Sequence, residues 1–200
     1  MGTTKEITGL ILAGGRARRM AGKDKGLIEL HGQPMIWWVL NRFSPQVSRV
    51  LISANRNQHQ YAAFGSPVVV DAAADFSGPL AGLAAGLARA QTEWLASVPC
   101  DSPLVPLDLV KRLYAQVIRD GVQAAVAHDG QRLQPVFSLV HRSLLPDLTR
   151  YLVGGERKID LWLERHSWRP VDFSDCQEMF FNVNTPEDLK AAGTWSQLTK

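Results

Sequence analysis

The chain has 200 residues and a formal net charge of +3. This excess lies in one segment, residues 14–25, which has five basic side chains and one acidic one and so carries +4, leaving −1 on the other 188 residues. A protein that binds DNA or a membrane by diffuse charge would spread its basic residues over a face or a tail, so we expect neither partner. The 46% hydrophobic content excludes a disordered chain, and no apolar run approaches the ~20 residues of a membrane helix.

The cysteines and the N-terminal residues bear on the cellular compartment. Cys100 and Cys176 lie 76 positions apart, and the chain has no Cys-x-x-Cys pair. This spacing suggests neither a disulfide framework nor a zinc site, so we expect two free thiols. No signal peptide is readable before the first apolar run, so we expect the protein in the cytoplasm.

Short apolar runs alternate with segments of helical periodicity from the N-terminus onward. The predicted strands cover residues 7–13, 49–53, 67–70, 94–98, 122–127, 135–140 and 171–173. The predicted helices cover residues 35–43, 79–90, 107–118, 144–152 and 156–164, and we expect Pro106 in the first turn of the third. The alternation up to about residue 120 predicts an α/β domain, a mostly parallel sheet with helices on both faces. We expect this single domain to span residues 1–200, with flexible ends at 1–6 and 192–200.

The cationic segment begins with two glycines that directly follow the first predicted strand. Open α/β sheets bind ligands at the carboxyl ends of their strands, so Gly14 and Gly15 stand where a ligand is expected. Glycines let backbone amides approach a phosphate closely, and several cations can neutralise its oxygens. The segment therefore predicts a polyphosphate site, with a solvated surface turn as the alternative; its cations are Arg16, Arg18, Arg19, Lys23 and Lys25.

Two common phosphate loops do not fit this segment. A Walker loop would need glycine at Ala17, and Ser or Thr where Asp24 stands. A dinucleotide fingerprint would need a third spaced glycine after Gly14 and Gly15. A P-loop NTPase and an NAD enzyme are therefore disfavoured.

Two carboxylates follow predicted strands and should face the same crevice. Asp71 follows a run of three valines, and Asp101 follows Val98, Pro99 and Cys100. Magnesium prefers one or two carboxylates together with phosphates and water, so we predict Asp101 as a metal ligand. A cap or turn role is the alternative for either aspartate.

Residues 12–20, Leu-Ala-Gly-Gly-Arg-Ala-Arg-Arg-Met, with Gly22, Asp24 and Lys25, resemble the signature loop of nucleotidyltransferases of Rossmann-like fold. Three further segments narrow the resemblance to the bacterial molybdenum cofactor guanylyltransferases, the MobA family, over residues 7 to about 189. These segments are Gly-Pro-Leu-Ala-Gly at 78–82, Pro-Cys-Asp-Ser-Pro at 99–103 and Phe-Asn-Val-Asn-Thr-Pro at 181–186.

The resemblance implies a single three-layer Rossmann-like domain and a transferase that joins GMP from GTP to molybdopterin, releases pyrophosphate and uses Mg²⁺. We expect a monomer whose partners are these two substrates and, transiently, other proteins of cofactor biosynthesis. A related nucleotidyltransferase that uses CTP or a sugar phosphate, and a GTP-binding protein without catalysis, are the alternatives.

The resemblance also assigns site residues. It implies a catalytic role for Asp101 at the metal, and we predict catalytic roles for Arg19 and Lys25, whose charges would stabilise the leaving pyrophosphate. Nucleotide or cofactor contacts are implied for Leu12, Ala13, Gly14, Gly15, Lys25, Ser53, Asp71, Gly78, Gly82, Asp101, Asn182 and Asn184. Ser53 stands where the family often has Asn, and nearby Asn55 could compensate. Gly82 could equally serve helix packing.

The last of these segments also predicts local structure. Asn182 and Asn184 flank Val183, so an extended backbone would point both amides to one face. Thr185 reads as a helix N-cap, with Asp188 as its capping-box partner.

Overall fold

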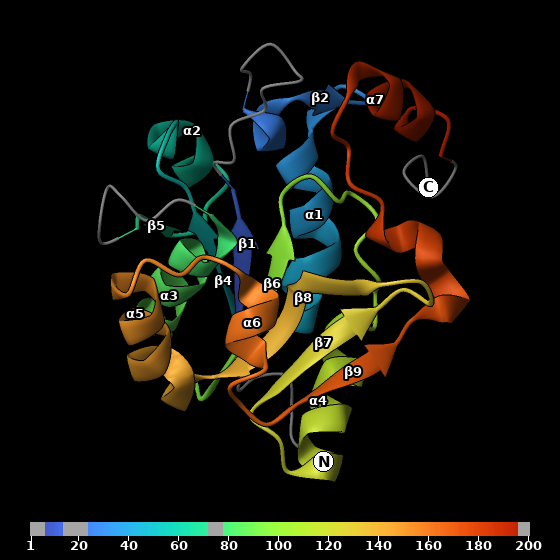
Figure 1. Ribbon diagram of the computed structural model, residues 1–200. Coiled ribbons are helices and arrows are strands. Elements are labelled where there is room, and N and C mark those ends of the chain that lie inside the picture. The colour runs from blue at the N-terminus through green and yellow to red at the C-terminus, as the bar shows by residue number, and fades with distance from the viewer. Residues whose placement is uncertain (1–6, 14–23, 72–77, 196–200) are drawn as a thin grey trace.

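The computed structural model describes residues 7–13, 24–71 and 78–195. Gly14, Gly15, Arg19 and the other residues of the cationic segment up to Lys23 lie outside the described residues. The expected flexible end at 1–6 also lies outside the described residues, as do residues 196–200 of the expected flexible end at 192–200. The described chain forms a seven-stranded sheet in the order β5-β4-β1-β6-β8-β7-β9 (Figure 1).

The sheet is mostly parallel, as the alternation of strands and helices predicts. Strand β8 pairs antiparallel with both β6 and β7, and the other neighbouring pairs in this sheet are parallel. The strands are β1 (Ile7–Leu12), β4 (Arg49–Ser53), β5 (Val68–Val69), β6 (Trp94–Pro99), β7 (Ala124–His128), β8 (Leu133–His141) and β9 (Trp168–Asp172). A separate hairpin joins β2 (Glu29–Leu30) to β3 (Gln33–Pro34).

Helices cover both faces of the sheet, which confirms the expected three-layer fold (Figure 1). On one face pack α1 (Met35–Phe43) and α4 (Leu109–Asp120). On the other pack α3 (Pro79–Arg89), α5 (Leu145–Val153) and α6 (Ile159–Leu163). Strand β1 contributes to the hydrophobic core on each face of the sheet. Ile7 and Ile11 pack on the side of α1 and α4, and Leu10 packs on the side of α3, α5 and α6.

A smaller apolar cluster lies beside the main domain core and holds α7 (Pro186–Ala192) against the chain around Leu30 and Met35. The 3₁₀ turn η3 (Lys25–Leu27) precedes this region, and the short helix α2 (Gln58–Ala62) follows β4. Neither α2 nor the small hairpin was predicted from the sequence. None of the helices in the described part of the chain has the length and apolarity needed to cross a lipid bilayer.

The expectation that Pro106 lies in the first turn of α4 is wrong, because the helix begins three residues later. Gln46, buried in the 3₁₀ turn η4 (Ser44–Gln46), donates to the Pro106 carbonyl at 2.8 Å and accepts from the Val110 amide at 3.0 Å. This side chain therefore satisfies a backbone amide that the first turn leaves without a helical partner. Helix α6 is also shorter than the predicted segment 156–164.

Candidate nucleotide site

Three neighbouring parallel strands end side by side at one edge of the sheet. The strand register pairs Leu12 of β1 with Ser53 of β4 and with Pro99 of β6. Backbone hydrogen bonds continue past the strand ends, from Ala13 N to Ser53 O at 2.8 Å and from Cys100 N to Leu12 O at 3.0 Å. This edge opens into a cavity of about 340 Å³, in the position where α/β sheets bind ligands.

Segments far apart in the sequence line this cavity. They are β1, β4, β6 and β8, η3, the start of α3, the chain two residues past β5, and the chain before α7. All the predicted site residues within the described part of the chain are among its lining: Leu12, Ala13, Lys25, Ser53, Asp71, Gly78, Gly82, Asp101, Asn182 and Asn184. The predictions for Gly14, Gly15 and Arg19 fall outside the described residues.

Lys25 reaches across the cavity to two predicted site residues. Its ammonium nitrogen lies 2.9 Å from Asp101 Oδ2 and also donates to Asn184 Oδ1. Only 20% of the Lys25 side chain and 11% of the Asp101 side chain are exposed. The Coulombic attraction within an ion pair in such a sheltered place is stronger than on the surface, because water screens it less. With the described residues Lys25 makes two of the three hydrogen bonds that an ammonium can donate.

The start of α7 holds the two asparagines in place. Thr185 and Asp188 form the predicted capping box, and Asp188 Oδ2 also accepts from the Asn184 amide at 2.9 Å. Asn182 and Asn184 both line the cavity, while Val183 between them is buried in the apolar cluster under α7. The alternation expected from the sequence is therefore present. Ser102 donates to Asn182 Oδ1, which ties this segment to the residue after Asp101.

On the β5 side of the cavity, Asp71 and Asn55 form a reciprocal pair. Asn55 Nδ2 donates to Asp71 Oδ2 at 2.8 Å, and the Asp71 amide donates to Asn55 Oδ1 at 3.0 Å. Burial raises the pKa of Asp71, and the hydrogen bond from Asn55 opposes this effect in part. Asp71 Oδ1 is buried and has no hydrogen-bond partner among the described residues. An acceptor in this state is suited to a donor on a ligand.

The glycines at the start of α3 have separate structural reasons. Gly78 precedes the helix with φ of +119° and ψ of 174°, a region essentially reserved for glycine. A Cβ at Gly82 would lie 2.5 Å from Leu12 Cδ2 and 2.6 Å from Ser53 Oγ. Gly82 therefore permits close packing of α3 on the strand ends, the alternative that the sequence left open.

Three lining residues were not predicted as site residues from the sequence: Pro99, Cys100 and Val136. Pro99 and Cys100 lie within a segment that carries the family resemblance, so the signal was present for them. Val136 belongs to β8, and no local pattern shows that this strand inserts beside β6. Burial raises the pKa of the Cys100 thiol well above its usual value, so it stays protonated and is not a nucleophile.

The donor atoms around Lys25 bear on the metal that the family resemblance implies. Asp101 brings one carboxylate to the cavity, and within the described residues no group of three or more His, Cys, Asp or Glu side chains is placed to hold a metal ion. A single carboxylate fits Mg²⁺, which commonly takes one or two carboxylates and completes its shell with substrate phosphates and water.

Comparison with known proteins agrees with this geometry. A family model described as the MobA-like NTP transferase domain matches residues 9–170. Molybdenum cofactor guanylyltransferases of Serratia proteamaculans and Vibrio cholerae are 52% and 49% identical over 184 residues, covering 92% of this chain and 92% and 90% of theirs.

The fold also has close structural relatives. The crystal structure of molybdopterin-guanine dinucleotide biosynthesis protein A from Archaeoglobus fulgidus matches with a TM-score of 0.77 and 26% identity, over 93% of this chain and 96% of that one. A CTP complex of CMP:2-keto-3-deoxy-manno-octonic acid synthetase has a TM-score of 0.76 at 14% identity, a likeness of fold alone. The chain therefore belongs to the MobA-like NTP transferase family, and within it to the molybdenum cofactor guanylyltransferases.

Proposed function

We propose that the protein transfers GMP from GTP to molybdopterin and releases pyrophosphate. The observation that carries this proposal is the cavity at the carboxyl ends of β1, β4 and β6, in which Lys25, Asp101 and Asn184 form one hydrogen-bonded group. Relatives about 50% identical over almost the whole chain bear the corresponding name. The CTP and sugar-phosphate alternatives have no comparable support.

The chemistry requires charge neutralisation and alignment rather than a covalent intermediate. An oxygen of the molybdopterin phosphate forms a bond to the α-phosphorus of GTP while the bond from that phosphorus to the bridging β-phosphate oxygen breaks. The attacking oxygen is already anionic, so no base has to remove a proton. Lys25 and Arg19, the latter outside the described residues, would neutralise the charge that develops on the leaving pyrophosphate.

The other lining residues position the substrates. Backbone groups of Leu12 and Ala13 would contact the base, and Asp71 Oδ1 would accept a hydrogen bond from the nucleotide. Asp101 would hold Mg²⁺, which supplies charge neutralisation and orientation of phosphate oxygens when it is bound. Asn182 and Asn184 would line the side of the cavity that faces the acceptor.

The test is an assay of guanylyl transfer with GTP, Mg²⁺ and molybdopterin, in which pyrophosphate and guanylylated pterin are both measured. We expect Lys25→Ala and Asp101→Ala each to lower the rate by about 10²–10³-fold, the usual cost of one charge contact in a transition state. Arg119→Ala on α4 is a charge-matched control, because Arg119 is 70% exposed and does not line the cavity. Full activity in either variant would contradict the assigned roles, and GTP binding without transfer in the wild type would indicate a non-catalytic protein.

A further inference from the structure

The residue before Lys25 carries a buried carboxylate that the proposed reaction does not use. Asp24 is 8% exposed and is not among the residues that line the nucleotide cavity. Burying a charged group costs free energy unless hydrogen bonds compensate it. The groups that donate hydrogen bonds to Asp24 therefore indicate the role of this carboxylate.

Both carboxylate oxygens of Asp24 accept hydrogen bonds from the region of α2. The Tyr61 hydroxyl donates to Oδ1, and Asn57 Nδ2 donates to Oδ2 at 3.0 Å. Tyr61 is fully buried, and burial raises the pKa of its hydroxyl, which therefore stays protonated and remains a donor. Asn57 precedes α2 with φ of +52°, a left-handed conformation that asparagine tolerates better than most residues.

The same tyrosine also packs on the residue after Lys25. A Cβ at Gly26 would lie 2.6 Å from the Tyr61 hydroxyl oxygen and 3.3 Å from Cys100 Cβ, so the backbone of the turn lies directly on these two side chains. The Asp24 carbonyl accepts from the Leu27 amide at 3.1 Å, which closes the turn η3. Tyr61 therefore holds both neighbours of Lys25.

We propose that Asp24, held by Tyr61 and Asn57, is a positioning residue that fixes the backbone of η3 so that the Lys25 ammonium points at Asp101, Asn184 and the phosphates of a bound nucleotide. None of these three residues lines the nucleotide cavity, so the unit would act through Lys25. A lysine side chain has four rotatable bonds, and a fixed backbone reduces the freedom that it must lose to reach the transition state. This inference rests on the proposed function of Lys25.

The direct test is Tyr61→Phe, which removes one hydroxyl and keeps the ring that fills the space beside Gly26. We expect kcat/KM for guanylyl transfer to fall about 10- to 100-fold, the scale of a misplaced catalytic group. Tyr151→Phe is the matched control, because Tyr151 is also buried and its hydroxyl donates one hydrogen bond, to Lys158 O at 2.9 Å, outside the cavity. Tyr151→Phe should lower the Tm by a similar amount and leave the activity unchanged.

A double-mutant cycle separates positioning from a merely structural role. If Tyr61 acts through Lys25, Tyr61→Phe should cost nothing further in a Lys25→Ala background. The cycle is measured for kcat/KM and also for the Kd of GTP with Mg²⁺, so the binding arm still reports on positioning if the wild type fails to transfer GMP. Multiplicative losses in the cycle, or full activity of Tyr61→Phe, would overturn the proposal.

A second variant covers the case in which Tyr61→Phe does not fold. Asn57→Gly keeps the left-handed backbone accessible and removes only the amide that donates to Asp24. We expect about a 3- to 10-fold loss in kcat/KM, again absent when Lys25 is alanine. A loss of the same size in that background would count against the proposal.

Discussion

Gly82 shows how a single missing side chain sets the geometry of the cavity. The glycine lies in the first turn of α3, where a Cβ would come within 2.6 Å of both Leu12 and Ser53. Both of these residues line the cavity at the ends of β1 and β4. The distance between the helix and the strand ends therefore depends on the absence of a side chain at this position.

We expect Gly82→Ala to destabilise the protein by about 1–3 kcal/mol, the usual cost of overpacking, and to raise the KM for GTP severalfold. Gly86→Ala provides the control, because its Cβ would come equally close, 2.6 Å, to Leu10 in the core one turn further along the same helix. The two variants should lose similar free energy of unfolding in urea, while only Gly82→Ala should alter the KM. Equal KM values would indicate that Gly82 serves packing alone.

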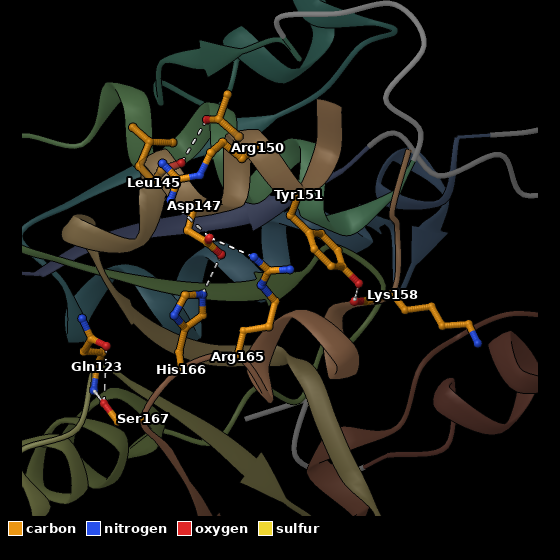
Figure 2. Close-up of polar contacts among 10 residues, drawn as sticks. Gln123, Leu145, Asp147, Arg150, Tyr151, Lys158, Arg165, His166 and Ser167 are labelled. Carbon is orange, nitrogen blue, oxygen red and sulfur yellow. Dashed lines mark hydrogen bonds and ion pairs between the residues drawn. The ribbon is translucent and has the colours of Figure 1, made fainter. Parts of the chain in front are cut away.

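At the scale of secondary-structure elements, one carboxylate joins α5 to the chain that follows α6. Figure 2 shows Asp147 at the centre of this contact. Its oxygens lie 3.1 Å from an Arg165 nitrogen, 3.0 Å from His166 Nε2 and 3.3 Å from an Arg150 nitrogen. Burial alone would raise the pKa of Asp147, but the hydrogen bond and charge of Arg165, the hydrogen bond from Arg150 and the charge of His166 together outweigh it and keep the pKa below its usual value.

A lowered pKa in the folded state means that the ionised carboxylate stabilises the fold above the pKa of the unfolded chain, about 3.9. We expect Asp147→Asn to lower the free energy of unfolding by about 1 kcal/mol at pH 7. The difference from the wild type should persist at pH 5 and disappear as the pH falls through the folded-state pKa, because Asp147 is then protonated. Urea unfolding at pH 7, 5 and 3 measures this.

Glu164→Gln is the control for the pH series, because Glu164 is an exposed carboxylate one residue before Arg165. Its effect should stay below about 0.5 kcal/mol at each pH. If the difference in free energy of unfolding between Asp147→Asn and the wild type is unchanged at pH 3, the contact acts by packing rather than by charge.

The elements that could be predicted are those with their own local signal. Apolar periodicity places α1 at residues 35–43 and the apolar run places β4 at 49–53, as observed. The five-residue helix α2 has no such periodicity, and the antiparallel insertion of β8 depends on pairing with β6 across some forty residues, as between Ser97 and Ser138.

The same limit applies to the cavity. Strand-end position and family resemblance brought Lys25, Asp71 and Asp101 into one predicted site. The hydrogen bond between Asp24 and Tyr61 joins residues 37 positions apart. It forms only because α2 packs against the turn that contains Gly26, and no local sequence pattern predicts that packing.

At the scale of the whole molecule, the net charge of +3 is a property of one region. Residues 14–25 carry +4, and their last member, Lys25, lies in the cavity beside Asp101. The rest of the chain is close to neutral, so we expect charge to attract a polyanion to the segment that ends at Lys25 rather than to a broad surface. The protein should therefore bind a nucleoside triphosphate strongly and nucleic acid weakly.

The expected response is thermal stabilisation by GTP with Mg²⁺. A ligand at 100 times its Kd adds about 2.7 kcal/mol to the folded state, which for a chain of this size raises the Tm by roughly 5–10 °C. CTP at the same concentration should raise it by less than about 2 °C, because a site that hydrogen-bonds the guanine edge leaves polar groups unpaired when cytosine binds. Lys25→Ala should lose most of the GTP shift, and Arg119→Ala should keep it. Equal shifts with GTP and CTP would contradict guanine selectivity and favour a cytidylyl or unselective enzyme, since the fold is shared by both.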